Sequence, residues 1–310
     1  MAPVTGASSP IEHLSIPNFT FHNGTTLPEV RVAYTVHNPQ NTKVAVVHTC
    51  FRGRIASTLT HATGVLKDHK IIVIALFGNG ESSSPSNMPN FPDDVEYTDC
   101  VNAQYQLLNA LDVKEVDVMM GFSMGGQMTY HWLVKHPLYI KNAVVICSAA
   151  KTSPHNYQFL EGPKSALLAA ATPEAGQRAF QELYKNLGAE TQAEWDDVAA
   201  GGNYNDWAAG DLLALYGMWQ RGDVTRCLSD AESDRSLEHA LKTIEARVLL
   251  MPCVHDQYFK SYVSEREAQQ LRKAHLDVFD SVWGHLAGSG ASATDTVWMS
   301  ERIGKFLASS

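Results

Sequence analysis

Five short runs of almost continuously apolar residues constrain the fold of this 310-residue chain more than any other feature. They lie at residues 44–49, 71–77, 115–121, 143–149 and 247–253. A strand is apolar at nearly every position only when both faces of its sheet are covered, and helical segments separate these runs. A further run, LDVFDSV at 276–282, is expected to form the last strand. The sequence therefore predicts an α/β fold with a mostly parallel central sheet flanked by helices.

Helical periodicity appears between the apolar runs. Segment 95–111 places four apolar residues on one helical face, and a second such pattern lies near the end of the chain. The residues that carry the two patterns are Val101, Tyr105, Leu108 and Leu111, and then Met299, Ile303, Phe306 and Leu307. Both segments are predicted to be helices.

One long segment breaks the alternation of strand and helix. Residues 151–246 contain no strand-like run, only alanine-rich helical stretches and three tryptophans, Trp195, Trp207 and Trp219. Both ends of this segment return to the same predicted sheet. We therefore expect a helical cap (lid) at 151–246, inserted between sheet strands of one core that residues 1–150 and 247–310 form together.

Composition and charge exclude several classes of function. The chain has 24 basic and 33 acidic residues, a net charge of −9, and no basic cluster. This argues against nucleic acid and against a polybasic membrane contact as partners. No apolar run approaches the roughly 20 residues that span a bilayer, and MAPVTGASSPIEHLS does not have the form of a secretory signal. The five cysteines are odd in number, which favours a reducing, cytoplasmic location.

No cofactor or metal motif is apparent. The cysteines lack metal-ligand spacing, and no glycine-rich loop ends in Lys-Ser or Lys-Thr. Gly78-Asn79-Gly80 follows an apolar run but continues into ESSSP rather than into a helix with a third glycine. We therefore expect neither a dinucleotide site nor a metal site.

The stretch GFSMGGQM, residues 121–128, carries the chemistry. An apolar run precedes its Gly-x-Ser-x-Gly pattern and a helical stretch follows it, which is the context of a nucleophile elbow. The turn would expose the hydroxyl of Ser123 and direct the backbone N–H of Met124 toward an oxyanion. A plain strand-to-helix turn is the alternative interpretation. The context favours a nucleophile.

A serine nucleophile requires a base and a carboxylate behind the base. Asp256 follows the run RVLLMPC, and His285 follows the final run, so both come after strand ends in the order serine, acid, histidine. Asp256 is alternatively a turn former, and neighbouring His255 competes as the base. His285 is favoured by its placement. Asp277 and Asp280 compete poorly as the acid, because both are expected inside the last strand.

The loop HTCFRG is expected to supply the second oxyanion donor, from the backbone N–H of Cys50 or Phe51. We interpret the Cys50 side chain as pocket lining rather than as a second nucleophile. Arg52 either meets an anionic group of the substrate or lies in solvent, with no preference between the two. Trp207 and Trp219 are further pocket candidates, although packing between cap helices is their more ordinary role.

Several segments resemble the homoserine O-acetyltransferase family of α/β-hydrolases. They are GFSMGGQM, FPDD with AQYQLLNALDV, AVVICSAAKTSPHNYQF, ALFGNGESSSPSN, HDQYF and WGH, and together they cover about residues 30–306. The resemblance implies the α/β-hydrolase fold, with Ser123 as nucleophile, Asp256 as orienting acid and His285 as general base. It also implies a homodimer formed through the cap.

The cap departs from that family. It lacks a Gly-His-x-x-Tyr-Arg-Ser-like stretch, and the base motif continues as GHLAG where the transferases have GHDxF. DLLALYGMWQRGDV instead resembles the branch usually described as α/β-fold hydrolases. Few charged groups are available to anchor an amino acid acceptor; they are Arg52, Lys164, Arg221, Asp211 and Asp223.

The sequence therefore predicts a serine hydrolase that cleaves a small-molecule ester or thioester through an acyl-enzyme. Both hydrolases and acyltransferases form this intermediate, and they differ in whether water or a bound acceptor receives the acyl group. The alternative is an O-acyltransferase that moves an acyl group from acyl-CoA to a small hydroxyl acceptor such as homoserine. A non-catalytic ligand-binding protein with a hydrolase-like fold is a minor alternative.

Overall fold

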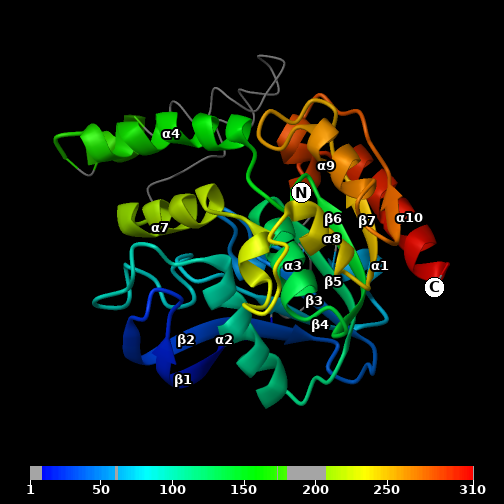
Figure 1. The fold of residues 1–310 in the computed structure, drawn as a ribbon, viewed down its shortest axis with the longest axis horizontal. Helices are drawn as coiled ribbons and strands as arrows, with labels where there is room; N and C mark the ends of the chain where they lie inside the picture. Colours follow the sequence, from blue (N-terminus) through cyan, green and yellow to red (C-terminus); the bar gives the residue numbers. More distant parts are fainter. Residues whose placement is uncertain (1–8, 60–61, 173, 180–206, 310) are drawn as a thin grey trace.

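A single eight-stranded sheet forms the centre of the computed structural model, which describes residues 9–59, 62–172, 174–179 and 207–309 (Figure 1). Its strand order is β1-β2-β4-β3-β5-β6-β7-β8. The strands are β1 (Glu12–Thr20), β2 (Thr26–His37), β3 (Val44–His48), β4 (Lys70–Ile74), β5 (Val116–Phe122), β6 (Ile140–Ile146), β7 (Arg247–Met251) and β8 (Ala274–Leu276). Strands β3 to β8 are parallel, whereas β1 and β2 are antiparallel to their neighbours. The predicted α/β class with a mostly parallel sheet is confirmed.

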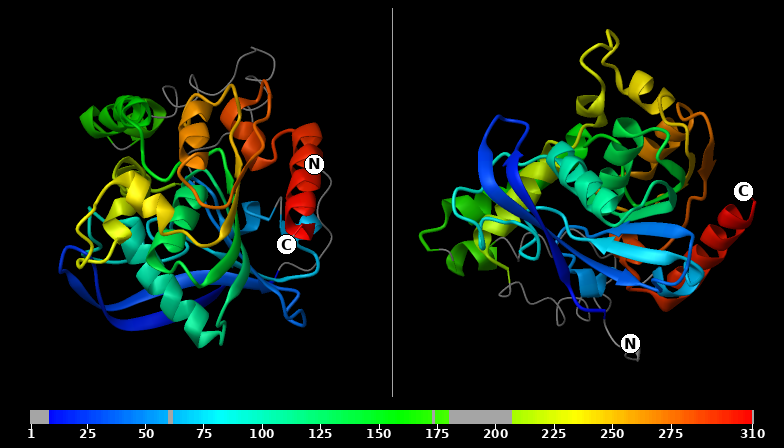
Figure 2. Two further views of the ribbon diagram at one scale, coloured as in Figure 1. Left: turned by 45° about the vertical axis from the view of Figure 1, so that its right-hand side comes forward. Right: turned by 90° about the horizontal axis from the view of Figure 1, so that it is seen from below.

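Consecutive residues of the central strands enter two different cores. In β3, Val44 and Val46 belong to one buried cluster, while Ala45 and Val47 belong to the other. The first cluster is covered by α2 (Tyr97–Ala110), α3 (Met124–Lys135) and α9 (Ser261–Ala268), and the second by α1 (Ala62–Val65) and α10 (Ala293–Ala308) (Figure 2). Burial of both faces explains why these strands are apolar throughout. The two predicted helices correspond to α2 and α10.

The position predicted for the last strand, residues 276–282, is wrong. The run expected at 276–282 forms a strand only as far as Leu276, where β8 ends, and an isolated bridge between Cys253 and Phe279 continues the pairing. Asp277 and Asp280 therefore lie beyond β8 and not inside it. β8 is the edge strand of the sheet, and Val278 and Val282 of the predicted run are exposed.

Two helices of the segment between β6 and β7 stand apart from the sheet. They are α4 (Pro154–Ala169) and α7 (Ala209–Gln220), which pack against each other (Figure 1). The chain then returns through the short helix η2 (Val224–Cys227), which contacts α3, and through α8 (Leu237–Lys242). Helical structure predicted around Trp195 lies outside the described residues. The assignment of 151–246 as one cap stays a prediction.

Candidate active site

Ser123 sits in a sharp turn between β5 and α3. Its φ is 56° and its ψ is −124°, in a region that costs a non-glycine residue on the order of 1–3 kcal/mol. Its backbone is fixed on both sides, because Ser123 N–H donates to the Ile146 carbonyl at 3.0 Å and Ser148 Oγ donates to the Ser123 carbonyl at 2.7 Å. The strained turn is thus held by strand β6 and the residues that follow it.

Three glycines let other atoms approach this turn. A Cβ on Gly121 would lie 2.0 Å from the Gly125 backbone, and one on Gly125 would lie 2.9 Å from the His48 carbonyl oxygen. A Cβ on Gly126 would lie 2.5 Å from the Ser148 side chain. All three separations are shorter than real Cβ contacts. The pattern G-F-S-M-G-G is therefore required by close packing of the turn against β3 and the end of β6.

The three residues predicted from chain order lie in a row of hydrogen bonds. His285 Nε2 is 2.9 Å from Ser123 Oγ, and His285 Nδ1 is 2.7 Å from Asp256 Oδ2. The other carboxylate oxygen, Asp256 Oδ1, accepts the N–H groups of Tyr258 at 2.7 Å and Phe259 at 2.9 Å. Ser123, Asp256 and His285 are 2%, 0% and 4% exposed.

The Asp256 carboxylate fixes the roles of the two imidazole nitrogens. An ionised carboxylate only accepts hydrogen bonds, so His285 Nδ1 must donate to it. In the neutral ring Nε2 then carries a lone pair and faces the Ser123 hydroxyl. This arrangement is suited to accept the serine proton.

Aromatic rings surround the His285 imidazole on several sides. Phe122 lies 4.7 Å from it between centroids, Tyr258 meets it edge-on at 4.6 Å, and Phe259 stacks on it at 5.7 Å. These three residues were not predicted from the sequence to be part of the site. Tyr258 and Phe259 belong to the motif HDQYF, and that was the available signal. We name Phe122, Tyr258 and Phe259 the aromatic clamp.

Cys147 adjoins Asp256 and His285 from the end of β6. Ligand atoms of the three residues lie within 4.8 Å of one another, which makes them the one group in the described part of the chain close enough to hold a metal ion. Burial and the nearby Asp256 charge raise the pKa of the Cys147 thiol well above its usual value. A thiol in this state is a poor metal ligand and a poor nucleophile, so these groups are better suited to proton transfer.

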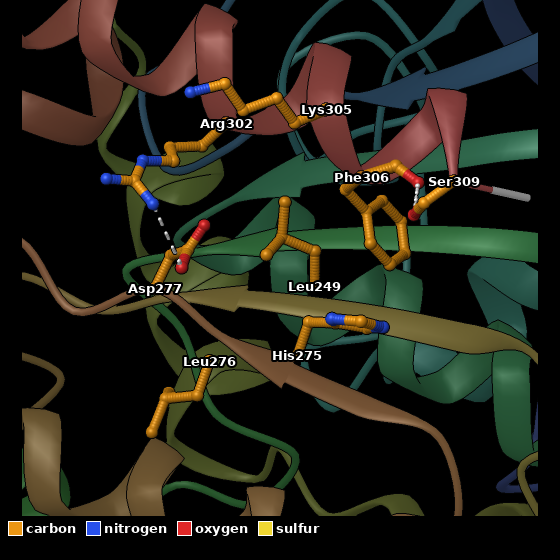
Figure 3. Close-up of a pocket in the computed structure, with 8 residues that line it drawn as sticks. All are labelled: Leu249, His275, Leu276, Asp277, Arg302, Lys305, Phe306 and Ser309. Atoms are coloured by element: carbon orange, nitrogen blue, oxygen red, sulfur yellow. Dashed lines mark hydrogen bonds and ion pairs between the residues drawn. The ribbon is translucent and has the colours of Figure 1, made fainter.

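The competing acid and base residues have other partners. His255 Nε2 forms an ion pair with Asp280 at 2.9 Å. Asp277 lies 3.9 Å from Arg302 in a groove of about 260 Å³ between β7, β8 and α10, which Figure 3 shows. None of the residues that line this groove belongs to the Ser123–His285–Asp256 row.

The expected oxyanion donors belong to two segments, the start of α3 and the turn after β3. Met124 is the first residue of α3, so its N–H is among those that a helix leaves without an intrahelical acceptor. Cys50, Phe51 and Arg52 form a tight turn just after β3, in which Arg52 is half-buried and has a φ of 55°. Burial raises the pKa of the Cys50 thiol to about 12, which fits a lining role rather than a nucleophilic one.

The two predicted pocket tryptophans have different environments. Trp207, just before α7, is 5% exposed and lies under the Arg54 guanidinium at 3.8 Å. Trp219, near the end of α7, is fully buried and stacks on Phe259 at 5.4 Å with an angle of 10° between the rings. Trp219 therefore contacts the aromatic clamp, whereas Trp207 packs against the loop after β3.

Four of the charged candidates for an amino acid anchor are engaged within the protein. Asp211 accepts the N–H and the hydroxyl of Ser86, at 2.9 Å and 2.6 Å. The other three are Lys164 with Gln220 at 2.9 Å, Asp223 with Lys151 at 2.7 Å, and Arg221 with the Val95 carbonyl at 3.1 Å. These contacts join α4 to α7, and they join α7 and the residues after it to other parts of the chain. They occupy groups that an acceptor would use.

Comparison with known proteins gives the class of this chain. The family profile described as the alpha/beta hydrolase fold matches residues 45–288. The chain is 27% identical to an ethyl acetate hydrolase of Pseudomonas veronii, with 97% of this chain and 96% of that protein aligned. It is 24% identical to a homoserine O-acetyltransferase of Methanococcoides burtonii over 62% of this chain and 46% of that protein. The solved structure of the acetyl esterase MekB superimposes with a TM-score of 0.84 at 26% identity, covering 96% of this chain and 97% of that one.

The chain belongs to the α/β hydrolase fold family. The resemblance predicted from the motifs is confirmed, and the protein is an enzyme of the serine-hydrolase type whose relatives are esterases and acyltransferases. Among the residues that the structure describes, no helix is both long and apolar enough to span a membrane.

Proposed function

We propose that this protein hydrolyses small acyl esters, with Ser123 as nucleophile, His285 as general base and Asp256 as the acid that orients it. The observation that carries the proposal is the buried row of hydrogen bonds from Ser123 Oγ through His285 to Asp256, at 2.9 Å and 2.7 Å. A base within hydrogen-bond reach of a serine, itself oriented by a carboxylate, is the arrangement that activates a hydroxyl at neutral pH.

The proposed reaction has two halves. Ser123 Oγ attacks the ester carbonyl carbon while His285 Nε2 takes its proton, and the oxyanion accepts N–H groups from Met124 and from the Cys50–Phe51 turn. The tetrahedral intermediate collapses, His285 gives the proton to the departing alkoxide, and the acyl group stays on Ser123. Water then attacks the acyl-serine while His285 takes its proton, the bond between the acyl carbon and Ser123 Oγ breaks, and His285 returns the proton to Oγ as the carboxylic acid leaves.

The substrate class rests on relatives and on the cap contacts. Ethyl acetate hydrolase and acetyl esterase are the names of relatives that align over nearly the whole chain. We therefore place short acyl esters first and thioesters second. Asp211, Lys164, Asp223 and Arg221 are engaged within the protein, which disfavours an amino acid acceptor. We further propose a cytoplasmic location, since all five cysteines are free, and a homodimer formed through the cap.

The test is product analysis with ethyl acetate and p-nitrophenyl acetate, with and without L-homoserine, for the wild type and Ser123→Ala. Hydrolysis predicts acetate released at a rate that homoserine does not change and that Ser123→Ala abolishes. O-acetylhomoserine as the main product would establish acyl transfer instead. Lack of Ser123 labelling by a fluorophosphonate, together with lack of turnover, would favour the non-catalytic alternative.

A further inference from the structure

A buried chain of hydrogen bonds joins the helix that follows Ser123 to the cap. Tyr97 Oη, on α2, is 2.8 Å from Gln127 Oε1 on α3, and Gln127 Nε2 is 2.9 Å from Thr152 Oγ1. Thr152 Oγ1 is in turn 2.5 Å from the backbone carbonyl of Trp219, in the last turn of α7. Tyr97, Gln127 and Trp219 are at most 1% exposed and Thr152 is 8% exposed.

The Trp219 carbonyl, at the end of this row of hydrogen bonds, determines which group donates in each of them. A backbone carbonyl only accepts, so the Thr152 hydroxyl must donate to Trp219. With its proton used there, Thr152 must accept from Gln127, which places the amide nitrogen toward Thr152 and the amide oxygen toward Tyr97. Hydrogen bonds aligned in one direction in a buried site strengthen one another.

Thr152 and Gln127 also fit the end of α7 closely. Thr152 N–H donates to the Gly222 carbonyl at 2.8 Å. A Cβ on Gly222 would lie 2.6 Å from Gln127 Nε2 and 3.0 Å from Thr152 Oγ1. The end of α7 is thus held against α3 through two contacts of Thr152, one from its backbone and one from its side chain.

Two ring contacts link Trp219 to His285, the proposed base. It stacks on Phe259 at 5.4 Å, and Phe259 stacks on His285 at 5.7 Å. On the cap side, Trp219 Nε1 donates to Asn156 Oδ1 of α4 at 2.8 Å. The ring is held between α4 and the aromatic clamp, while the Trp219 carbonyl accepts the Thr152 hydroxyl and the Gly222 N–H, the latter at 3.1 Å.

We propose that Thr152 and Gln127 are positioning residues that seat Trp219 behind Phe259 and thereby hold His285 in line with Ser123. The inference rests on the proposed function of His285 as base. It adds that the cap contributes to the orientation of the base, in addition to covering the site. Acylation of Ser123 then depends on a hydroxyl that touches neither substrate nor reacting atoms.

The experiment compares Thr152→Val, which keeps the shape and removes the hydroxyl, with Thr152→Ser, which keeps the hydroxyl. Thr35→Val is the matched control, because Thr35 is a buried threonine of β2 whose hydroxyl bonds His37 and does not touch the cap. Each variant is checked for folding by circular dichroism and thermal melting. The measurements are kcat and KM for ethyl acetate, and the pre-steady-state burst of p-nitrophenolate from p-nitrophenyl acetate.

The proposal expects Thr152→Val to lower the acylation rate and kcat about 10-fold, the scale of a small misplacement of a catalytic group. KM should stay within about 2-fold, since no substrate contact is removed. Thr152→Ser should restore most of the rate, and Thr35→Val should behave as the wild type. The Trp219 indole N–H resonance, assigned by its loss in Trp219→Phe, should shift in Thr152→Val and return in Thr152→Ser.

A folded Thr152→Val enzyme with wild-type acylation and kcat would overturn the proposal, as would a slow Thr152→Ser that matches Thr152→Val. If Thr152→Val does not fold, Gln127→Met replaces it, because this variant removes the hydrogen bond from Gln127 to Thr152. The same fall in acylation rate and kcat is then expected, and wild-type values in a folded Gln127→Met enzyme would overturn the proposal. Failure of the proposed function is distinguishable, since wild-type protein would then show no Ser123-dependent turnover at all.

Discussion

The two sides of the proposed active site are built in different ways. Ser123 is placed by the backbone geometry of its turn, which close-packed glycines, the Ile146 carbonyl and the Ser148 hydroxyl fix. His285 is 162 residues away and is placed by side chains. These are Asp256, Tyr258 and Phe259 on one loop and Trp219 of α7 behind them. We therefore expect substitutions around Ser123, the nucleophile side, to abolish activity, whereas substitutions around His285, the base side, should lower kcat in graded steps.

The largest effect is expected from substitution of Ser123, the proposed nucleophile. Ser123→Ala should lower kcat by roughly 10⁴-fold or more, since removal of a nucleophile from a triad has that scale. Ser123→Gly should be equally inactive but more stable than Ser123→Ala by about 1 kcal/mol, because glycine adopts a φ of 56° without strain. Ester hydrolysis and urea unfolding measure the two quantities. Equal stability of the two variants would contradict the view that backbone strain is stored at this turn.

Next in size is the effect of a methyl group at the elbow. Gly126→Ala would place a Cβ 2.5 Å from the Ser148 side chain, which itself bonds the Ser123 carbonyl. We expect a loss of about 1–3 kcal/mol of stability together with most of the activity.

The matched control for this methyl group is Gly162→Ala in α4, where nothing lies within 4 Å of the added Cβ. It should be neutral or stabilising by up to about 1 kcal/mol. Thermal melting decides between the outcomes. A Gly126→Ala protein as stable and active as Gly162→Ala would show that the elbow is less tightly packed than its distances indicate.

A smaller, graded loss is expected on the base side. Phe259→Leu keeps an apolar side chain but removes the ring stacked between His285 and Trp219. We expect kcat to fall roughly 3- to 10-fold with little change in KM, because misorientation of a catalytic group acts mainly in the transition state.

Phe91→Leu is a suitable control for Phe259→Leu. Phe91 is a buried phenylalanine that contacts Phe21 and Phe77 rather than His285. Steady-state kinetics of the two variants separate orientation of the base from general loss of packing. Loss of more than 10³-fold in Phe259→Leu would contradict a graded base side.

The sequence predicted the nucleophile side more completely than the base side, for a physical reason. The Ser123 turn is encoded within eight consecutive residues, GFSMGGQM, whose glycines follow from local close approach. Asp256 and His285 followed from chain order. Trp219 was predicted as a pocket candidate, but its contact with Phe259 forms only after folding. No periodicity in the sequence distinguishes an aromatic residue of the clamp from one in the core. Strands β1 and β2 were not predicted from the sequence, because they lie at one edge of the sheet and most residues of β1 are exposed.

Strand β8, at the opposite edge of the sheet, was also predicted poorly from the apolar pattern of the sequence. The apolar run LDVFDSV predicted a strand through 282, but hydrogen-bonded pairing ends at Leu276 and only Phe279 bridges further. Of the residues beyond β8 in this run, only Phe279 and Ser281 are buried, whereas Val278 and Val282 are exposed. An apolar pattern at a sheet edge therefore does not establish strand pairing. For that reason Asp277 and Asp280 were expected inside a strand and are found beyond it, paired with Arg302 and His255.

The smallest effect on activity is expected from a buried acid that supports the segment between the two sides. Glu267 of α9 is 2% exposed and accepts the N–H of Ala150 at 2.8 Å and the hydroxyl of Tyr130 at 2.9 Å. Burial raises the pKa of its carboxyl to about 8, although these hydrogen bonds act in the opposite direction.

The raised pKa of Glu267 makes the free energy of unfolding depend on pH. In the unfolded chain this carboxyl titrates near 4.5, so between about pH 4.5 and 8 the folded protein holds a proton that the unfolded chain has released. The stabilising contribution is therefore complete below pH 4.5 and is lost as the pH rises through about 8. Glu267→Gln stays neutral, so its stability relative to the wild type should increase across this window, by a few kcal/mol at most.

Urea unfolding at pH 5, 7 and 9 measures this difference, and Glu265→Gln, an exposed position on the same helix, is the control. A gap between Glu267→Gln and the wild type that widens with pH, while Glu265→Gln shows none, would establish Glu267 as the titrating group. A constant gap would mean that Glu267 keeps the same charge in the folded and unfolded states. Glu267 bonds Ala150, two residues before Thr152, so a gap that widens with pH would also mean that ionisation of Glu267 acts on the segment that joins β6 to α4.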